Sequence, residues 1–381
     1  MTRVPTLCLV CLLTASAVPA SAQSVEDFDR LLVRALELHK AGDILGAIDT
    51  YKSALTILPD RADALSNLGA AYVRLGQFDD AIVQYEAALK AEPTNQSVRL
   101  NLALAYYKSA RPNQAIPQLR RVLSSDPEAR NAYLLLADCY LQTGQDKEVI
   151  TLLKPRAQMF ESDLAYAFLL GTALLYSGDT EEGQKYVDRV FSAGESAEAH
   201  LLLGIAHLGR QDYRSAKTEL EQAIKLNSKL PTAHSLYGRS VRALGDQDAA
   251  ERAFRKELEL NVNDFEANLQ LGNLRKDAQK FAEASTYLER ATTIRPNDLV
   301  ARKLLASLRL QTGRTEEAVQ ILEAIVKDAP DLLEAHVQLA TGYTRLKRKE
   351  DAEREQEIIE RLNAQIQAKQ RGGGSPDERP D

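Results

Sequence analysis

The residue types that most often perform chemistry are few and scattered in this chain, which has five histidines and three cysteines. His200 and His207 are seven residues apart and could share a helix face, but no carboxylate or cysteine accompanies them at metal-ligand spacing. The glycines follow a regular spacing and close turns, and none of them forms a phosphate-binding loop motif. We therefore predict no catalytic residue, no metal site, no cofactor and no enzyme activity.

Two other observations favour packing over reactivity. Three histidines, His200, His234 and His336, occupy the same position of a repeating pattern, which indicates a role in the core or in a groove rather than in metal binding. Cys139 stands where other repeats carry alanine, so we expect a small buried side chain rather than a reactive thiol.

The first 22 residues have the pattern of a secretory signal peptide. Arg3 supplies a positive start, and the apolar run 6–18 is shorter than the roughly 20 residues that span a bilayer as a helix. Small residues at Ala20-Ser21-Ala22 suit cleavage near Ala22. We expect an exported protein, periplasmic or secreted, with no membrane insertion of the mature chain. A short membrane anchor is the alternative interpretation of this segment.

The composition is that of a folded protein, because hydrophobic residues make up 44% of the chain and charged residues 27%. The net charge is -6, and residues of both signs are mixed along the chain rather than grouped in blocks. This distribution lacks the basic surface that binds nucleic acid, so we predict no nucleic-acid partner.

Small residues recur along the chain at steps of 34 residues, with a single step of 33. The first series is Ala35, Gly69, Ala103, Ala137, Gly171, Gly204, Gly238, Gly272, Ala306 and Ala340. The second is Ala47, Ala81, Ala115, Val149, Gly183, Ala216, Ala250, Ala284, Ala318 and Ala352. Such a period is the signature of a stacked repeat protein.

Each repeat contains two amphipathic stretches with apolar residues three and four positions apart, which predicts two helices. A short turn such as Leu75-Gly76-Gln77 separates the two stretches, and prolines such as Pro59 and Pro93 stand where the second helix must end. The small residues allow the two helices to approach closely. One such pair cannot bury its own apolar face, so stacking of neighbouring pairs must complete the core.

The pattern Asn67-Leu68-Gly69, Tyr72, Gly76, Ala81, Tyr85, Ala88 and Pro93 resembles the consensus of the tetratricopeptide repeat family. The resemblance covers 28–366 and implies an all-α, right-handed superhelical solenoid of about ten antiparallel helix pairs with a C-terminal capping helix. The predicted pairs are 28–61, 62–95, 96–129, 130–163, 164–196, 197–230, 231–264, 265–298, 299–332 and 333–366. Residues 130–196 depart most from the consensus, since Pro155 falls within a second helix. We expect the tail 372–381 to be disordered.

The family's geometry implies that the first helix of each pair lines a groove in which a peptide binds. The implied groove residues are Asn67, Asn101, Tyr107, Leu134, Leu135, Phe168, Leu169, Tyr176, Leu201, Leu202, Ile205, Leu208, Arg239 and Arg242. The apolar middle of this set would hold aliphatic or aromatic side chains of a partner. The alternative is that several of these leucines pack between helices. The basic clamp by which some family members hold a chaperone's C-terminal carboxylate is missing.

These observations predict a non-enzymatic protein-interaction scaffold of the bacterial cell envelope, whose partner is an unidentified protein or peptide. The alternatives are a structural or self-associating solenoid, and an accessory subunit of an envelope enzyme or secretion complex. The sequence leaves the oligomeric state open.

Overall fold

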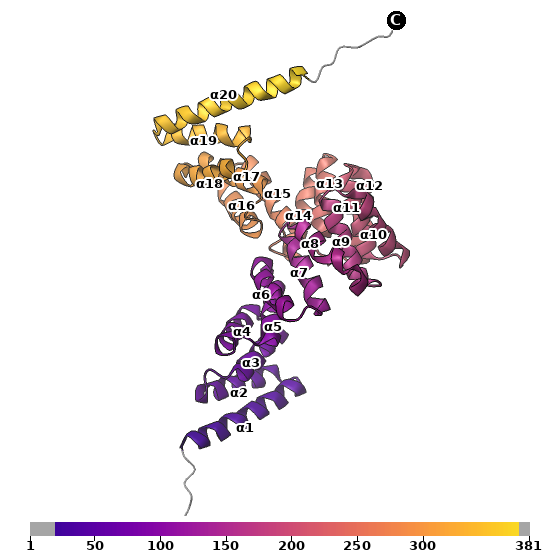
Figure 1. Cartoon of the computed structure of the whole chain (residues 1–381), viewed down its shortest axis with the longest axis vertical. Helices are drawn as coiled ribbons and strands as arrows, with labels where there is room; N and C mark the ends of the chain where they lie inside the picture. Colours follow the sequence, from indigo (N-terminus) through magenta and orange to yellow (C-terminus); the bar gives the residue numbers. More distant parts are fainter. Residues whose placement is uncertain (1–19, 373–381) are drawn as a thin grey trace, which may run out of the picture. The chain divides into compact units, whose positions relative to one another are not determined.

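The computed structural model of the protein describes residues 20–372. The predicted signal peptide lies outside this part of the chain except for Ala20–Ala22, and so does the predicted tail after Gly372. Within the described residues the fold is all-helical, with twenty α-helices that follow one another in pairs (Figure 1). The predicted all-α solenoid is confirmed.

The contacts divide the chain into two compact units, Met1–Ser109 and Ala110–Asp381, which we call unit 1 and unit 2. Unit 1 contains α1 (Ala20–Ala41), α2 (Ile44–Ile57), α3 (Ala62–Arg74), α4 (Phe78–Ala91) and α5 (Gln96–Lys108). Unit 2 begins with α6 (Pro112–Ser125), α7 (Arg130–Gln142), α8 (Asp146–Leu153), α9 (Leu164–Tyr176) and α10 (Thr180–Ser192).

The middle of unit 2 contains α11 (Ala197–Gly209), α12 (Tyr213–Leu226), α13 (Ala233–Ala243), α14 (Gln247–Leu260), α15 (Phe265–Asp277) and α16 (Phe281–Ile294). It ends with α17 (Leu299–Gln311), α18 (Thr315–Asp328), α19 (Leu333–Arg345) and α20 (Lys349–Gly372). In the numbering of Figure 1, the odd-numbered helices are the first helices of their pairs and the even-numbered ones are the second.

The two helices of a pair touch where the first series of small residues lies. A Cβ atom added to Gly204 in α11 would stand 2.6 Å from Cγ of Leu220 in α12, and one added to Gly238 would stand 2.7 Å from the Phe254 ring. Leu220 and Phe254 are both fully buried. A large side chain of the second helix therefore occupies the space that a side chain of the first helix would need.

We predict that Gly204→Ala destabilises unit 2 by about 1–2 kcal/mol, because overpacking against Leu220 outweighs the gain in helix propensity. Gly209 is the matched control, since it ends the same helix with no atom within 4 Å of an added Cβ. Gly209→Ala should stabilise the protein by up to about 1 kcal/mol. Urea unfolding followed by circular dichroism measures both changes, and equal effects of the two substitutions would contradict the close approach.

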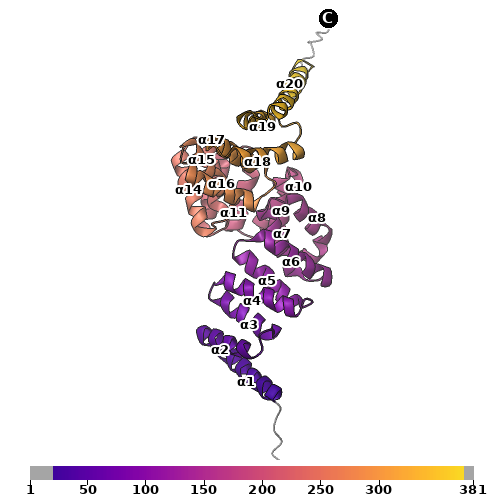
Figure 2. The ribbon, with the colours of Figure 1, turned by 90° about the vertical axis from the view of Figure 1, so that its left-hand side faces the viewer.

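Unit 2 bends so that its first helices lie on the inner side. Contacts link successive first helices from α7 to α19, whereas no comparable contact links successive second helices in the described part of unit 2 (Figure 2). A stack in which one row of helices is closer together than the other must curve toward that row. We call the surface formed by the first helices of unit 2 the inner face.

Polar contacts between distant repeats close this curve. The Arg295 guanidinium donates hydrogen bonds to the carbonyl oxygens of Leu141 and Gln142, each at 3.2 Å, and lies 4.2 Å over the Phe265 ring. Nδ2 of Asn113 donates to the carbonyl of Ile294 at 2.9 Å. All three carbonyls belong to the last turns of α7 and α16, where helices leave carbonyl groups without internal partners.

Arg295→Ala should loosen this closure. We expect amide hydrogen exchange in 139–146 to become about tenfold faster, because hydrogen bonds to a charged donor contribute about 1.5–3 kcal/mol. Lys256→Ala is the control, since it removes an exposed ion pair with Glu259 at 2.7 Å that contributes little. Unchanged exchange in 139–146 after Arg295→Ala would show that the closure does not depend on Arg295.

The irregularity expected at Pro155 is present in the structure. Helix α8 ends at Leu153, a 3-10 helix follows over Lys154–Phe160, and Arg156 has non-helical backbone angles (φ -110°, ψ 20°). Proline lacks the N–H that would continue the α-helix. Phe160 restores the packing, since it is fully buried and its ring stacks on Tyr166 with centroids 5.2 Å apart.

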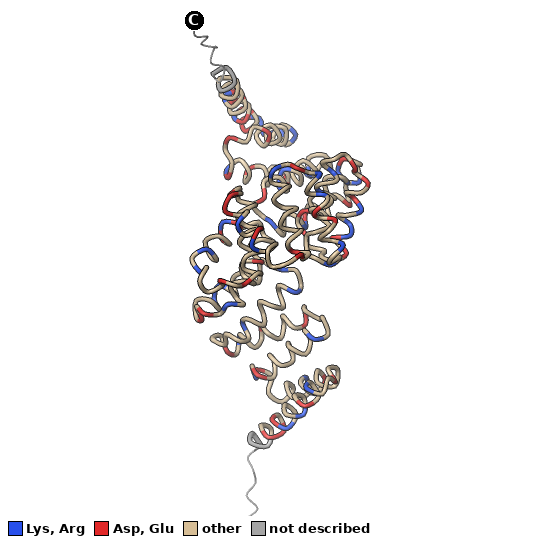
Figure 3. Tube along the Cα trace, turned by 90° about the vertical axis from the view of Figure 1, so that its right-hand side faces the viewer, with Lys and Arg blue, Asp and Glu red and all other residues tan. Residues whose placement is uncertain are grey.

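The apolar residues of the predicted capping helix, α20, are buried only in its first part. Ile359 and Leu362 are buried, whereas Ile366 is 42% exposed. Positive and negative side chains alternate along the helices rather than forming blocks (Figure 3). Within residues 20–372, none of the helices combines the length and the apolar character that crossing a membrane requires.

Candidate functional site

The predicted groove residues fall in both units. Asn67, Asn101 and Tyr107 lie on α3 and α5 of unit 1, and each is partly exposed. The other predicted residues lie on α7, α9, α11 and α13 of unit 2. The sequence predicts one groove for all of these residues, whereas in the structure they belong to two separate compact units.

The apolar middle of the predicted groove is not exposed. Leu201, Leu202, Ile205 and Leu208 are between 0% and 4% exposed, and Leu169 is 7% exposed. The first four belong to one core cluster with residues of α9 and α13, because neighbouring first helices pack against α11 from both sides. The expectation of an exposed patch at these residues was therefore wrong, and the alternative, packing between helices, describes them.

Other predicted residues stay accessible on the inner face. Tyr176, at the end of α9, is 40% exposed, and Leu134, Leu135 and Phe168 are partly exposed. Desolvation raises the pKa of the Tyr176 hydroxyl, and the positive charges of Arg239 and Arg295 act in the opposite direction. Tyr176 and Arg239 are therefore close enough to interact electrostatically, although they lie on different repeats.

Arg239 and Arg242 line a cavity of about 720 Å³. The two arginines lie on α13, one helical turn apart, and Asn273 and Asp277 come from the facing helix α15. The remaining lining residues are Tyr213, Ala243, Gln247, Leu274 and Ala278. We call this space the arginine cavity. Tyr213 and Gln247 escaped the sequence analysis because they begin second helices, which the family's geometry places outside the groove.

Positive charge is in excess at the arginine cavity. Among the described residues, neither Arg239 nor Arg242 makes an ion pair, and both are partly buried. The carboxylate of Asp277 pairs with Nζ of Lys276 at 3.5 Å. The cavity therefore presents two guanidinium groups and one carboxylate whose charge already has a partner.

Other buried arginines of unit 2 do have carboxylate partners. Arg275 contacts Glu251 at 2.5 Å and Glu283 at 2.9 Å, and Arg302 contacts Asp328 at 2.7 Å. Burial of a charge is costly unless a partner compensates it. Arg239 and Arg242 are only partly buried. Like the partly buried Arg156, Arg189, Arg290 and Arg295, they make no ion pair among the described residues.

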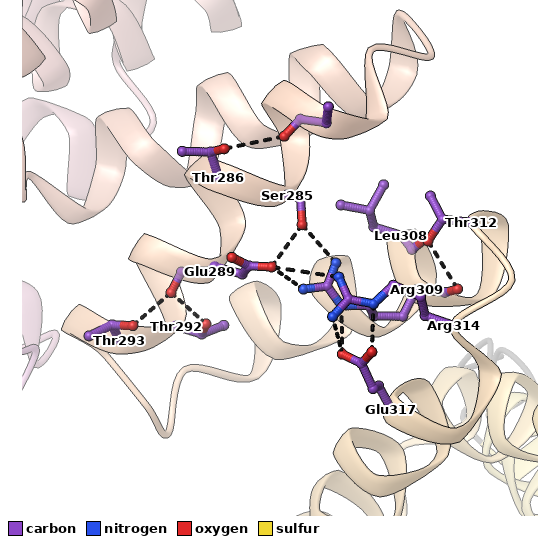
Figure 4. A network of polar contacts seen from close by, with 11 residues as sticks. Ser285, Thr286, Glu289, Thr292, Thr293, Leu308, Arg309, Thr312, Arg314 and Glu317 are labelled. Atoms are coloured by element: carbon purple, nitrogen blue, oxygen red, sulfur yellow. Dashed lines mark hydrogen bonds and ion pairs between the residues drawn. The ribbon is translucent and has the colours of Figure 1, made fainter.

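Arg309 shows the same compensation in more detail. It donates to Oγ of Ser285 at 2.7 Å, pairs with Glu289, and contacts Glu317 at 3.3 Å (Figure 4). Arg314 makes a second contact with Glu317 at 2.5 Å. The network joins α16, α17 and α18, and its role is to connect consecutive helix pairs.

Two buried carboxyl groups, one near the end of α14 and one just before α15, bind backbone N–H groups. Glu257 is fully buried, and its carboxylate accepts hydrogen bonds from the backbone N–H groups of Thr232, at 2.9 Å, and His234, at 3.1 Å. Thr232 has φ 66°, a conformation that β-branched residues rarely adopt, and its side chain does not cap α13. Glu257 therefore supplies the missing cap of α13.

Asp264 caps α15 by accepting a hydrogen bond from the Ala267 N–H at 2.8 Å. Burial, followed by the nearby charge of Glu257, raises the pKa of the Asp264 carboxyl to about 7. Burial also raises the pKa of Glu257, against the lowering effect of its backbone hydrogen bonds. The folded state therefore binds a proton at this pair more tightly than the unfolded state does.

We predict that the stability contributed by Asp264 and Glu257 falls as the pH rises from 4 toward 8, because a carboxyl with a raised folded-state pKa favours folding only while it is protonated. Asp264→Asn keeps the cap and removes the charge, so it should raise the free energy of unfolding at pH 8 by on the order of 2 kcal/mol and change little at pH 4. Thermal unfolding at both pH values measures this.

Asp298→Asn is the matched control, because Asp298 caps α17 through the Ala301 N–H at 2.9 Å and lies one repeat farther along the chain. It should leave the pH dependence intact. The same gain at pH 8 from both substitutions would contradict the role given to the Asp264 charge.

His200, His336 and Cys139 contribute to the packing of the helices. His200 contacts Glu219 at 2.7 Å, and His336 contacts Glu355 at 2.6 Å, so both link the first helix of a pair to the second. Cys139 is fully buried, as predicted, and burial raises the pKa of its thiol. Within the described residues, no group of three or more histidine, cysteine, aspartate or glutamate side chains is arranged to hold a metal ion.

Comparison with protein families gives matches along much of the chain. One tetratricopeptide repeat model matches 275–341, and another matches 100–148, 168–213 and 201–261. A model described as TPR repeat matches 35–76 and 71–109. Together these ranges cover well over half of the chain.

The chain is also similar to a human protein, "Protein O-mannosyl-transferase TMTC1". The two are 24% identical over 155 residues, which is 39% of this chain and 18% of the human protein. The matched region is thus about a fifth of that relative's length.

Proposed function

Since this chain is a tetratricopeptide repeat protein, we propose that it is a non-enzymatic scaffold that binds a segment of a partner protein on the inner face of unit 2. The arginine cavity carries this proposal, because it is a hollow on the first helices with unpaired charge at its wall. Tyr176 extends the same face beyond the cavity. Rigid helices hold these side chains in fixed positions, which suits recognition of a partner.

We further propose that the scaffold acts after export, in the bacterial cell envelope or outside the cell. The positive start, the short apolar run and the small residues before Ala22 support this part of the proposal. The transferase named for the human relative is not part of it, because the match covers 18% of that protein.

Self-association is the second candidate. Exposed apolar side chains on second helices favour it, among them Leu226, which is 50% exposed at the end of α12. A second copy of the chain could cover such residues. The experiment that tests the scaffold also separates it from this alternative.

A photo-crosslinkable phenylalanine derivative at position 176 should capture a partner from an extract of the source organism. Tyr176 is exposed on the inner face, so its replacement should preserve the fold. The matched chain carries the derivative at position 226, on a second helix. We expect discrete crosslinked products from position 176 alone, identified by mass spectrometry and reduced by excess wild-type chain.

Crosslinking to the same proteins from both positions would contradict binding on the inner face. Products that contain only copies of this chain would support the self-associating solenoid. Circular dichroism of both variants establishes that the helices are intact before either result is interpreted.

A further inference from the structure

We infer that the arginine cavity binds an acidic segment of the partner protein, with Arg239 and Arg242 each holding a carboxylate of that segment. This inference rests on the proposed function and adds to it the chemistry of the partner. It depends on three features of the cavity, namely its unpaired guanidinium groups, its size and its amide side chains.

The first feature is that two guanidinium groups without an ion pair line the same cavity, whereas the buried arginines of unit 2 have carboxylate partners. Arg275, Arg302 and Arg309 are buried and contact carboxylates of the chain. Arg239 and Arg242 are partly buried with no ion pair among the described residues. A partly desolvated guanidinium without an anion is unfavourable, so an external carboxylate would supply the compensation that the chain provides elsewhere.

The second feature is size. The cavity, at about 720 Å³, is much larger than a single phosphate or carboxylate ion. It lies within the roughly 300–1,000 Å³ of typical ligand pockets, so it accommodates several side chains of an extended peptide. The apolar atoms of Ala243, Leu274 and Ala278 also line it, and they suit the aliphatic stems of glutamate side chains.

The third feature is the placement of the amides Gln247 and Asn273 at the cavity wall. An amide side chain both donates and accepts hydrogen bonds, so it can bind the peptide main chain whatever the sequence is. The guanidinium groups are planar forks that match a carboxylate with two hydrogen bonds. Amides would then hold the backbone, while the arginines select acidic side chains.

Direct binding to the full chain tests this inference. The probe is a short fluorescein-labelled peptide of glycine and glutamate. The control peptide has the same sequence with every glutamate replaced by glutamine. We expect fluorescence anisotropy to show binding of the glutamate peptide alone. Added salt should weaken that binding, because it screens the charges.

Substitutions at the cavity sharpen the test. Arg239→Gln with Arg242→Gln should weaken binding of the glutamate peptide by about ten- to a hundredfold, since two charge-assisted contacts are lost. Arg239→Lys with Arg242→Lys should retain part of the affinity, because the charge remains and the planar fork does not. Circular dichroism must show that both variants are folded.

The control variant removes the same charge elsewhere in unit 2. Arg121 on α6 and Arg214 on α12 are exposed residues of second helices, and Arg121→Gln with Arg214→Gln should bind the glutamate peptide as the wild type does. Equal loss of affinity in the control and the cavity variant would overturn the inference, because binding would then follow net charge alone.

Two further outcomes would also overturn it. Equal binding of the glutamate and glutamine peptides would exclude an acidic segment as the ligand, while partner capture at position 176 could still stand. Displacement of the peptide by inorganic phosphate at comparable concentration would reassign the cavity to a phosphate-bearing ligand. Failure of partner capture with a positive peptide result would instead remove the scaffold and leave the cavity's preference for carboxylates.

Discussion

The close approach of the two helices of a pair, within unit 1 and within unit 2, is the constraint on which the rest of this fold depends. Gly69, Gly204 and Gly238 leave no space for a side chain, because Tyr85, Leu220 and Phe254 of the second helices occupy it. The two helices then act as one rigid element whose remaining apolar surface must be covered by the next pair. The spacing of the first helices, and with it the curvature of unit 2, follows from how these elements stack.

The sequence predicts this constraint because it is local and repeated. A small residue every 34 positions, facing a large one in the following helix, requires no knowledge of distant contacts. Exposure on the inner face is a different matter. Leu201 and Ile205 point to the expected side of α11, but neighbouring first helices stand close enough to bury them. Contacts such as Arg295 with Leu141 likewise join residues whose separation along the chain has no local signature.

Some contacts of the charged residues also follow from the repeat pattern, whereas others depend on irregular features of the fold. His200 with Glu219 and His336 with Glu355 recur at equivalent positions of two repeats, so one pattern explains both pairs. Glu257 has no such counterpart among the pairs described above. Its role arises from the left-handed backbone of Thr232, which leaves the start of α13 without a cap from its own side chain. An irregular turn thus recruits a buried carboxylate from another helix.

Position within the repeat also explains why some arginines have partners and others do not. Arg275, Arg309 and Tyr343 are spaced by one repeat, and each contacts a glutamate on the preceding second helix, namely Glu251, Glu289 and Glu323 respectively. Their side chains therefore lie between consecutive pairs, where a second helix can supply a carboxylate. Arg239 and Arg242 lie instead on the side of α13 that lines the arginine cavity, together with the first helix α15. The carboxylate there, Asp277, already pairs with Lys276, so a carboxylate of a partner protein would give these two arginines the compensation that Glu251 and Glu289 give to Arg275 and Arg309.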